Sequence, residues 1–226
     1  MRSIPLLALA ACLSATARAQ VISLDEGSFT ITRSGDRVGR EDFSIRSSPA
    51  DGGSVLVAHG VVAMGARRIE PSLNADTSGG VLKYQTEVRE SGRAVVTYSG
   101  EFARDHYRAR SSRPDGESSR EFRLPPGTVA VEDDVVHQLW FVVRRGAGAA
   151  VPVLAPLRNV VETVRVELVG MEPLSIDSHD VLARHLRLRT EGSGATRDVW
   201  VDAAGRLLKV AIPATRIVAI RDEIPG

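Results

Sequence analysis

Apolar and polar residues alternate in short runs along most of this chain, and this alternation restricts the fold more than any other feature. In the clearest run, one side of the segment is formed by Leu82, Tyr84, Thr86 and Val88. Successive residues of a strand point to opposite faces of a sheet, so this period indicates strands with one buried face. We therefore predict an all-β protein, an antiparallel curved sheet or half-barrel of about 10–11 strands.

Short clusters of turn-forming residues separate these runs. Ser34-Gly35, Ser91-Gly92 and Pro114-Asp115-Gly116 each lie between two alternating segments, and glycine supplies the backbone conformations that tight hairpins need. A further tight turn is expected at Asp202-Ala203-Ala204-Gly205. Pro213 should end or edge the strand that precedes it, because proline cannot donate a ladder hydrogen bond.

One segment breaks the alternation, from Glu132 to Arg145. Its apolar residues recur at helical spacing, at Val135, Val136, Leu139, Val142 and Val143. Acidic residues near its start and basic residues near its end suit a helix dipole, and Gly146 follows where a helix commonly ends. The pattern predicts one helix over residues 132–145. We expect this helix to cover the apolar face of the sheet, because large exposed apolar patches are rare.

Four residues are the candidate ligand contacts: Tyr84 and Tyr98 on the apolar strand faces, and Leu139 and Trp140 on the predicted helix. A curved sheet with one covering helix can enclose an apolar molecule such as an acyl chain. The sequence therefore favours a binding or carrier protein for an apolar, lipid-like ligand that displaces the helix. The alternative is a structural or interaction protein of the envelope, in which the same aromatic residues only pack a closed core.

The N-terminus has the features of a signal peptide. Arg2 precedes an apolar stretch from Ile4 to Leu13, and Ala17-Arg18-Ala19 matches the small-residue cleavage pattern. We expect a signal peptide over residues 1–19, cleavage before Gln20, and a periplasmic or secreted domain over residues 20–226. In the alternative, Leu9-Ala10-Ala11-Cys12 is a lipobox and Cys12 carries a lipid anchor. No later segment is long and apolar enough for a transmembrane helix.

Charge and cysteine content exclude several classes of protein. The chain has 29 basic and 28 acidic residues, whereas a dedicated nucleic-acid binder needs a basic excess to neutralise phosphates. Cleavage after Ala19 would remove the one cysteine, and with it any disulfide or cysteine metal site. No protein partner is indicated.

The search for catalytic motifs returns only near-misses. Asp76-Thr77-Ser78-Gly79 is one residue longer than an aspartic-protease turn. Ser178-His179-Asp180 has the residue types of a hydrolase triad, but adjacent side chains do not converge as a triad requires. Asp133 and His137 would be four residues apart on a helix, yet two ligands do not complete a metal site. His185 is interpreted as an isolated strand residue. We therefore expect no enzymatic activity, cofactor or metal.

The two ends of the domain resemble known proteins. Phe29-x-Ile31 followed by Glu41-x-Phe43-x-Ile45, and the closing segment from Val199 to Val210, are similar to the opening and closing hairpins of exported bacterial β-rich families of unknown function. The resemblance implies a β-rich periplasmic protein, distantly like lipoprotein-carrier half-barrels. Those families have no established active site, so the resemblance assigns no functional residues.

Overall fold

The computed structural model describes residues 20–103 and 106–226, and these form one 15-stranded sheet. The prediction of an all-β curved sheet is confirmed. The expected signal peptide, its cleavage site after Ala19 and the alternative anchor Cys12 lie outside the described residues. Within the described part of the chain, no helix is long and apolar enough to cross a membrane.

The first half of the sheet is a meander in which each strand pairs with its sequence neighbours. Its strands are β1 (Ile22–Arg33), β2 (Asp36–Ala50), β3 (Gly53–Met64), β4 (Arg67–Ala75), β5 (Val81–Glu90), β6 (Arg93–Ala103), β7 (His106–Arg113) and β8 (Gly116–Phe122). All of these pairs are antiparallel. The turns predicted at Ser34-Gly35 and Ser91-Gly92 are two-residue hairpins with positive φ at both positions.

The second half of the sheet is joined to the first through its last strand, β15, which pairs with β1. Its strands are β9 (Val129–Ala130), β10 (Ala150–Ala155), β11 (Val160–Ile176), β12 (His179–Thr190), β13 (Thr196–Val201), β14 (Leu207–Ile212) and β15 (Ile217–Arg221). Only the β9–β10 pair is parallel among the described strands. Two 3-10 turns, η2 (Pro156–Arg158) and η3 (Pro213–Thr215), connect strands. β14 ends at Ile212, directly before Pro213, as predicted.

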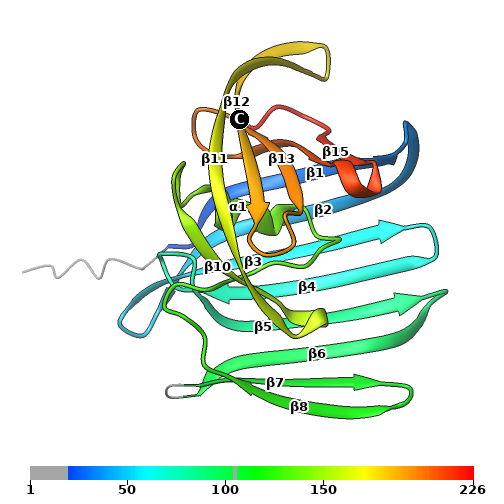
Figure 1. Cartoon of the computed structure of the whole chain (residues 1–226), viewed down its shortest axis with the longest axis vertical. Coiled ribbons are helices and arrows are strands. Elements are labelled where there is room, and N and C mark those ends of the chain that lie inside the picture. Colours follow the sequence, from blue (N-terminus) through cyan, green and yellow to red (C-terminus); the bar gives the residue numbers. More distant parts are fainter. Residues whose placement is uncertain (1–19, 104–105) are drawn as a thin grey trace, which may run out of the picture.

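The sheet curls so that its two halves face one another, with strands β10–β13 crossing in front of the first meander (Figure 1). The sheet remains open, since β8 and β9 are its two ends. The β9 end nevertheless reaches the middle of the first meander, where the Val81 N–H donates to the Thr128 carbonyl at 2.8 Å. Strands β6–β8 extend beyond this contact. The result is a barrel-like wrap around a central space.

That central space holds the only α-helix of the described residues. This helix, α1 (Trp140–Val143), directly follows the 3-10 turn η1 (His137–Leu139). We call the two elements together, residues 137–143, the plug. The plug is shorter than the predicted helix because residues 132–136 are not helical, and Asp133 and Asp134 bind arginines of β4, β13 and η2 instead of capping the helix. Gly146 ends the segment at φ +83°, as the sequence indicates.

Two apolar clusters stabilise the wrap. The main core lies between the two halves and includes every residue of the plug except the polar His137 and Gln138. A smaller cluster, Ile176, Ala183, Trp200 and Leu208, lies on the opposite face. There the long β11–β12 hairpin curls back over β13 and β14. The strand count exceeds the prediction because some strands, such as the exposed β8, show no apolar alternation.

Candidate functional site

All four candidate ligand contacts lie in the main core. The exposed fraction is 0% for Tyr84, 3% for Tyr98, 4% for Leu139 and 8% for Trp140. The Tyr84 and Tyr98 rings meet edge to face at 6.0 Å, and the Trp140 ring contacts Phe141 in the same way at 5.0 Å. The structure thus places the tyrosines on the sheet and Leu139 and Trp140 on the plug, all facing the same interior.

A hydrogen bond connects these two groups of residues. The Gln138 Nε2 amide of the plug donates to the Tyr84 hydroxyl at 3.3 Å. The Gln138 Oε1 in turn accepts the backbone N–H of Glu132 at 2.7 Å. Because Gln138 is fully buried, both bonds form away from competing water and fix the plug against β5.

The start of the plug is held by a carboxylate from the sheet. Glu41 of β2 is completely buried, and its two oxygens accept the backbone N–H groups of Val136 and His137, each at 2.7 Å. The same carboxylate contacts the Nδ1 atom of His137 at 2.7 Å. Glu41 therefore provides the hydrogen-bond acceptors that the first turn lacks.

The imidazole of His137 fills a space left by a missing side chain. It stacks on Phe43 at 5.6 Å between ring centroids and lies directly over Gly60 of β3. Its Nε2 atom makes no hydrogen bond with any described residue. The first residue of the plug, His137, is thus a buried polar residue, and its packing depends on the glycine at position 60 of β3.

A second buried carboxylate lies at the entrance to the plug. The Glu132 Oε1 atom accepts the Leu157 N–H at 2.6 Å. Burial raises the pKa of Glu132 to about 8, although the Leu157 hydrogen bond partly opposes this shift. At neutral pH the side chain is therefore mostly protonated, and it adds a hydrogen-bond donor to the interior.

Sequence reasoning missed Glu41, Gly60 and Glu132. For Glu41 a signal is present, because it precedes Phe43 and Ile45 at an inward position of an alternating strand. The weighed pairing of Asp133 with His137 does not form: His137 binds Glu41, while Asp133 binds Arg158 and Arg197. Among the described residues, no group of three or more histidine, cysteine or acidic side chains is arranged to hold a metal.

The other two segments whose sequences resemble catalytic motifs are a loop and a hairpin. The Asp76 Oδ1 atom accepts the N–H groups of Ser78 and Gly80 at 2.7 and 3.0 Å, which makes this segment a polar loop. Asp177 and Ser178 form the tip of the β11–β12 hairpin with positive φ, and His179 and Asp180 are the first residues of β12, so the three residues belong to a hairpin rather than to a triad.

His185 is not isolated. Its Nδ1 atom contacts Glu172 at 2.8 Å, its Nε2 atom contacts Asp198 at 2.9 Å, and its ring stacks on Trp200 at 4.3 Å. The Trp200 indole N–H donates to Glu172 at 2.9 Å. This cluster joins β11, β12 and β13 on the outer face, beside the smaller apolar cluster, and it fastens the curled hairpin to the sheet.

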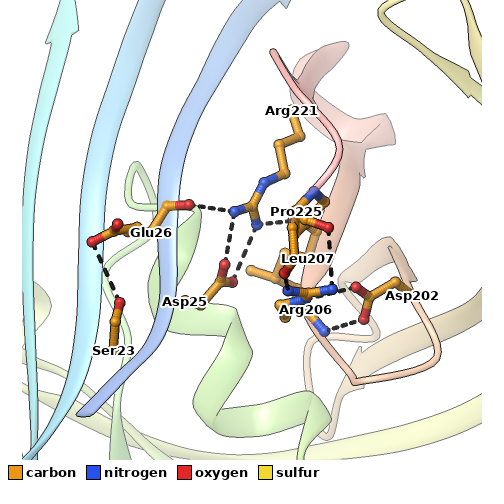
Figure 2. A network of polar contacts seen from close by, with 9 residues as sticks. Ser23, Asp25, Glu26, Asp202, Arg206, Leu207, Arg221 and Pro225 are labelled. Carbon is orange, nitrogen blue, oxygen red and sulfur yellow. Dashed lines mark hydrogen bonds and ion pairs between the residues drawn. The ribbon is translucent and has the colours of Figure 1, made fainter.

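A buried ion pair lies where the two chain halves meet. The Arg221 guanidinium of β15 binds both carboxylate oxygens of Asp25 in β1, at 2.7 and 3.2 Å, and donates to the Leu207 carbonyl at 3.2 Å (Figure 2). Arg221 and Asp25 are both almost fully buried. Next to this pair, Arg206 binds Asp202 and the carbonyl groups of residues 225 and 226. The network joins the two halves of the sheet at the β1–β15 junction.

A hollow of about 540 Å³ lies on the outer face of β5–β8. Its lining is polar, including Lys83, Gln85, Ser99, Arg108 and Arg110. These residues alternate with the inward-facing Tyr84, Tyr98 and Tyr107, so the hollow and the plug lie on opposite sides of the sheet. The apolar interior face itself is occupied by the plug.

The sequence matches no protein-family model and no curated protein sequence. The fold is similar to the crystal structure of a β-barrel-like protein of the domain of unknown function DUF1849 from Brucella abortus. The TM-score is 0.52 at 9% identity, over 90% of this chain and 97% of that one. A second structure, a DUF1089 family protein from Pseudomonas aeruginosa, gives a TM-score of 0.40 at 13% identity, over 94% and 98% of the two chains.

The similarity to the Brucella protein shows a shared β-barrel-like fold. It confirms, at the level of the fold, the expected resemblance to bacterial β-rich families of unknown function. It assigns no ligand and no site, so the function of this chain has to be argued from its own residues.

Proposed function

We propose that the protein is an exported, non-enzymatic protein of the bacterial envelope that binds an apolar, lipid-like ligand on the concave face of its sheet. One observation carries this proposal: the apolar face of an open, curved sheet is covered by a seven-residue plug that belongs to no strand. An apolar ligand that replaces the plug restores the burial that the plug provides, because the hydrophobic effect depends on the apolar area removed from water.

The connections of the plug support such an exchange. The segment after it contains Gly146 and Gly148, both with positive φ, and residues 146–149 form no strand. On its other side the chain runs through turns from residue 132 to residue 136. The plug is therefore held by its apolar packing and by contacts with Glu41, Tyr84 and the backbone of Glu132. Its flanks are held by the ion pairs of Asp133 and Asp134 and by backbone hydrogen bonds of residues 148 and 149 with Val166. Reorienting the flanks breaks these contacts but none of the strands.

The export part of the proposal rests on the N-terminal sequence. We expect the protein purified from its native host to begin at Gln20 after cleavage behind Ala19. Intact mass measurement and N-terminal sequencing test this directly. A diacylated N-terminal Cys12 would replace the soluble form by an anchored one, and an uncleaved chain would overturn export.

The chain offers a built-in reporter for ligand binding. It has two tryptophans: Trp140 lies in the plug, and Trp200 lies on the outer face against His185. We expect titration with a monomeric fatty acid to change the fluorescence of the Trp200→Phe variant, in which only Trp140 remains. The Trp140→Phe variant, which keeps only Trp200, is the matched control and should show little change.

A second candidate function keeps the core closed. The β11–β12 hairpin exposes an apolar strip, with 58% of Leu168, 57% of Met171 and 62% of Leu182 accessible, which favours contact with another protein or surface. In that case fatty acids and phospholipids give no saturable signal from Trp140. Truncation of Trp140 to Ala would then only destabilise the fold, by about 3–5 kcal/mol.

A further inference from the structure

The interior next to the plug contains three buried hydroxyl groups that have no well-formed hydrogen bond among the described residues. They belong to Thr86, Tyr98 and Tyr107, and the exposed fractions of these residues are 5%, 3% and 0%. The Tyr98 and Tyr107 hydroxyls lie near enough to shift the pKa of each other, and the Thr86 hydroxyl lies near enough to that of Tyr84 to oppose the rise in its pKa. A buried hydroxyl without a partner costs stability, commonly about 1–3 kcal/mol. Three of them on neighbouring strands point to a group that they would bind. We call them the hydroxyl cluster.

The three groups lie on the inward face of β5–β7. Thr86 and Tyr98 are direct cross-strand partners, and such partners project from the same face. Tyr107 packs over Gly100, where an added Cβ atom would lie 2.4 Å from its hydroxyl oxygen. Gly100 pairs in turn with Tyr84, whose ring contacts Tyr98. The absence of a side chain at residue 100 therefore makes the room that Tyr107 occupies in this cluster.

The plug places an amide beside this cluster. The Gln138 side chain binds the Tyr84 hydroxyl and accepts the Glu132 N–H. If the plug leaves, the Tyr84 hydroxyl and the Glu132 N–H both lose this partner. The interior then presents two further polar groups that can donate to the same incoming acceptor.

The charge state of the surroundings is also favourable for an acceptor. Burial raises the pKa of Tyr98 to about 12 and raises the pKa of Tyr107 further, so both hydroxyls keep their protons at neutral pH. Burial also keeps Glu132 mostly protonated. The cluster itself consequently consists of neutral donors, and the carboxylate that acts on Tyr107, that of Glu101, is exposed on the outer side of β6.

We propose that the hydroxyl cluster binds the carboxyl head of a long-chain fatty acid, whose tail takes the place of the plug on the apolar face. This inference rests on the proposed function, because the cluster becomes accessible only when the plug is displaced. A carboxylate accepts several hydrogen bonds at once, and bonds to an ionised acceptor are roughly twice as strong as neutral ones. An alcohol head offers fewer acceptor sites, and a quaternary ammonium head offers none.

The test compares three sixteen-carbon probes that differ only in the head group: palmitic acid, hexadecanol and hexadecyltrimethylammonium, each below its micelle concentration. Binding is followed by Trp140 fluorescence in the Trp200→Phe protein. We expect palmitic acid to bind at least about tenfold more tightly than the other two, since one buried hydrogen bond to a charged acceptor contributes about that factor or more. A Tyr98→Phe, Tyr107→Phe double variant keeps both rings and should lose this preference while still binding hexadecanol.

The matched control is Thr97→Val, which removes a hydroxyl from the exposed side of the same strand and should leave the preference intact. Equal affinities for the three probes, or an unchanged preference in the double variant, would overturn the hydroxyl cluster as the head-group site and leave lipid binding standing. The absence of saturable binding by any of the probes would overturn the proposed function itself, together with this inference. Circular dichroism confirms that each variant retains the β fold.

Discussion

The imidazole of His137 occupies the space that any side chain at residue 60 would need. A Cβ atom added to Gly60 would lie 2.4 Å from the His137 Cε1 atom and 2.9 Å from Nδ1. The same Nδ1 atom binds Glu41, and the ring stacks on Phe43. The conformation of the plug is therefore linked to the absence of a side chain in β3.

We expect Gly60→Ala to displace the ring and to weaken the Glu41 contact. Forcing an extra methyl group into a packed core commonly costs about 1–3 kcal/mol, so the free energy of unfolding in urea should fall by this amount. The control is Gly170→Ala in β11, where an added Cβ meets nothing within 4 Å. An equal effect of both substitutions would contradict the role given to residue 60. If the plug is displaced by ligand, Gly60→Ala should also bind fatty acid more tightly.

Glu132 should make the stability depend on pH. Its pKa is raised from 4.5 to about 8 in the folded protein, chiefly by burial, so the folded state binds this proton more tightly than the unfolded state. The stabilisation is therefore complete below pH 4.5 and is lost as the pH rises to about 8. Each pKa unit corresponds to about 1.4 kcal/mol, so the loss should reach a few kcal/mol. Urea unfolding at several pH values measures it.

Glu132→Gln keeps an oxygen for the Leu157 N–H and removes the titrating group. We expect this variant to lose the decrease in stability between pH 4.5 and 8 and to be more stable than the unmodified protein at the upper end. Glu117→Gln, in the exposed strand β8, serves as the control and should keep the decrease. A pH dependence that survives in Glu132→Gln would show that another group causes it.

Removing one partner of the Asp25–Arg221 pair should destabilise the fold strongly, whereas replacing both partners by apolar residues should have a small effect. Removing one partner of a buried ion pair leaves an unpaired charge, which costs about 3–5 kcal/mol. We expect Arg221→Met alone to destabilise the fold by this amount. The double variant Asp25→Leu, Arg221→Met should recover most of the loss. A double variant as unstable as the single one would indicate that the carbonyl contacts of Arg221, rather than its charge, hold β15 to β1.

The outer cluster around His185 should respond to acid. The pKa of Glu172 is lowered because its carboxylate accepts the Trp200 N–H and a hydrogen bond from His185. A group with a lowered pKa stabilises the fold above its ordinary value, here 4.5, and loses this contribution as the pH falls below it. We expect the fluorescence of Trp200, read in the Trp140→Phe variant, to change in that range. Glu172→Gln should abolish the change, while far-UV circular dichroism stays constant.

The local parts of the fold follow from the sequence, because they depend on neighbouring residues. The alternation around Tyr84 places its strand, and pairs such as Ser91-Gly92 adopt the positive φ that a two-residue hairpin needs. The end of the plug at Gly146 is set in the same way. Strands without alternation cannot be predicted in this way, because β8 is exposed on both sides and β9 has only two residues.

The candidate site is predictable only in part, because its polar contacts join distant residues. Tyr84, Tyr98, Leu139 and Trp140 are correctly expected to face one interior. The Glu41–His137 contact spans 96 residues, and nothing local to either residue indicates its partner. The expected helix is too long for the same reason. Asp133 and Asp134 have charges that suit a helix start, yet arginines of β4, β13 and η2 bind them.

The order of the strands has a consequence for how the chain folds. Almost every strand pairs with its sequence neighbour, so most of the sheet forms by zipping successive hairpins with little loss of chain entropy. The β1–β15 junction is the exception: the Ser28 hydroxyl binds Asp222 across 194 residues. The chain entropy lost in closing so long a loop has to be overcome before the contacts between β1 and β15 stabilise the fold. The two meanders can therefore form independently, and joining them at β1 and β15 should be the slow kinetic step of folding.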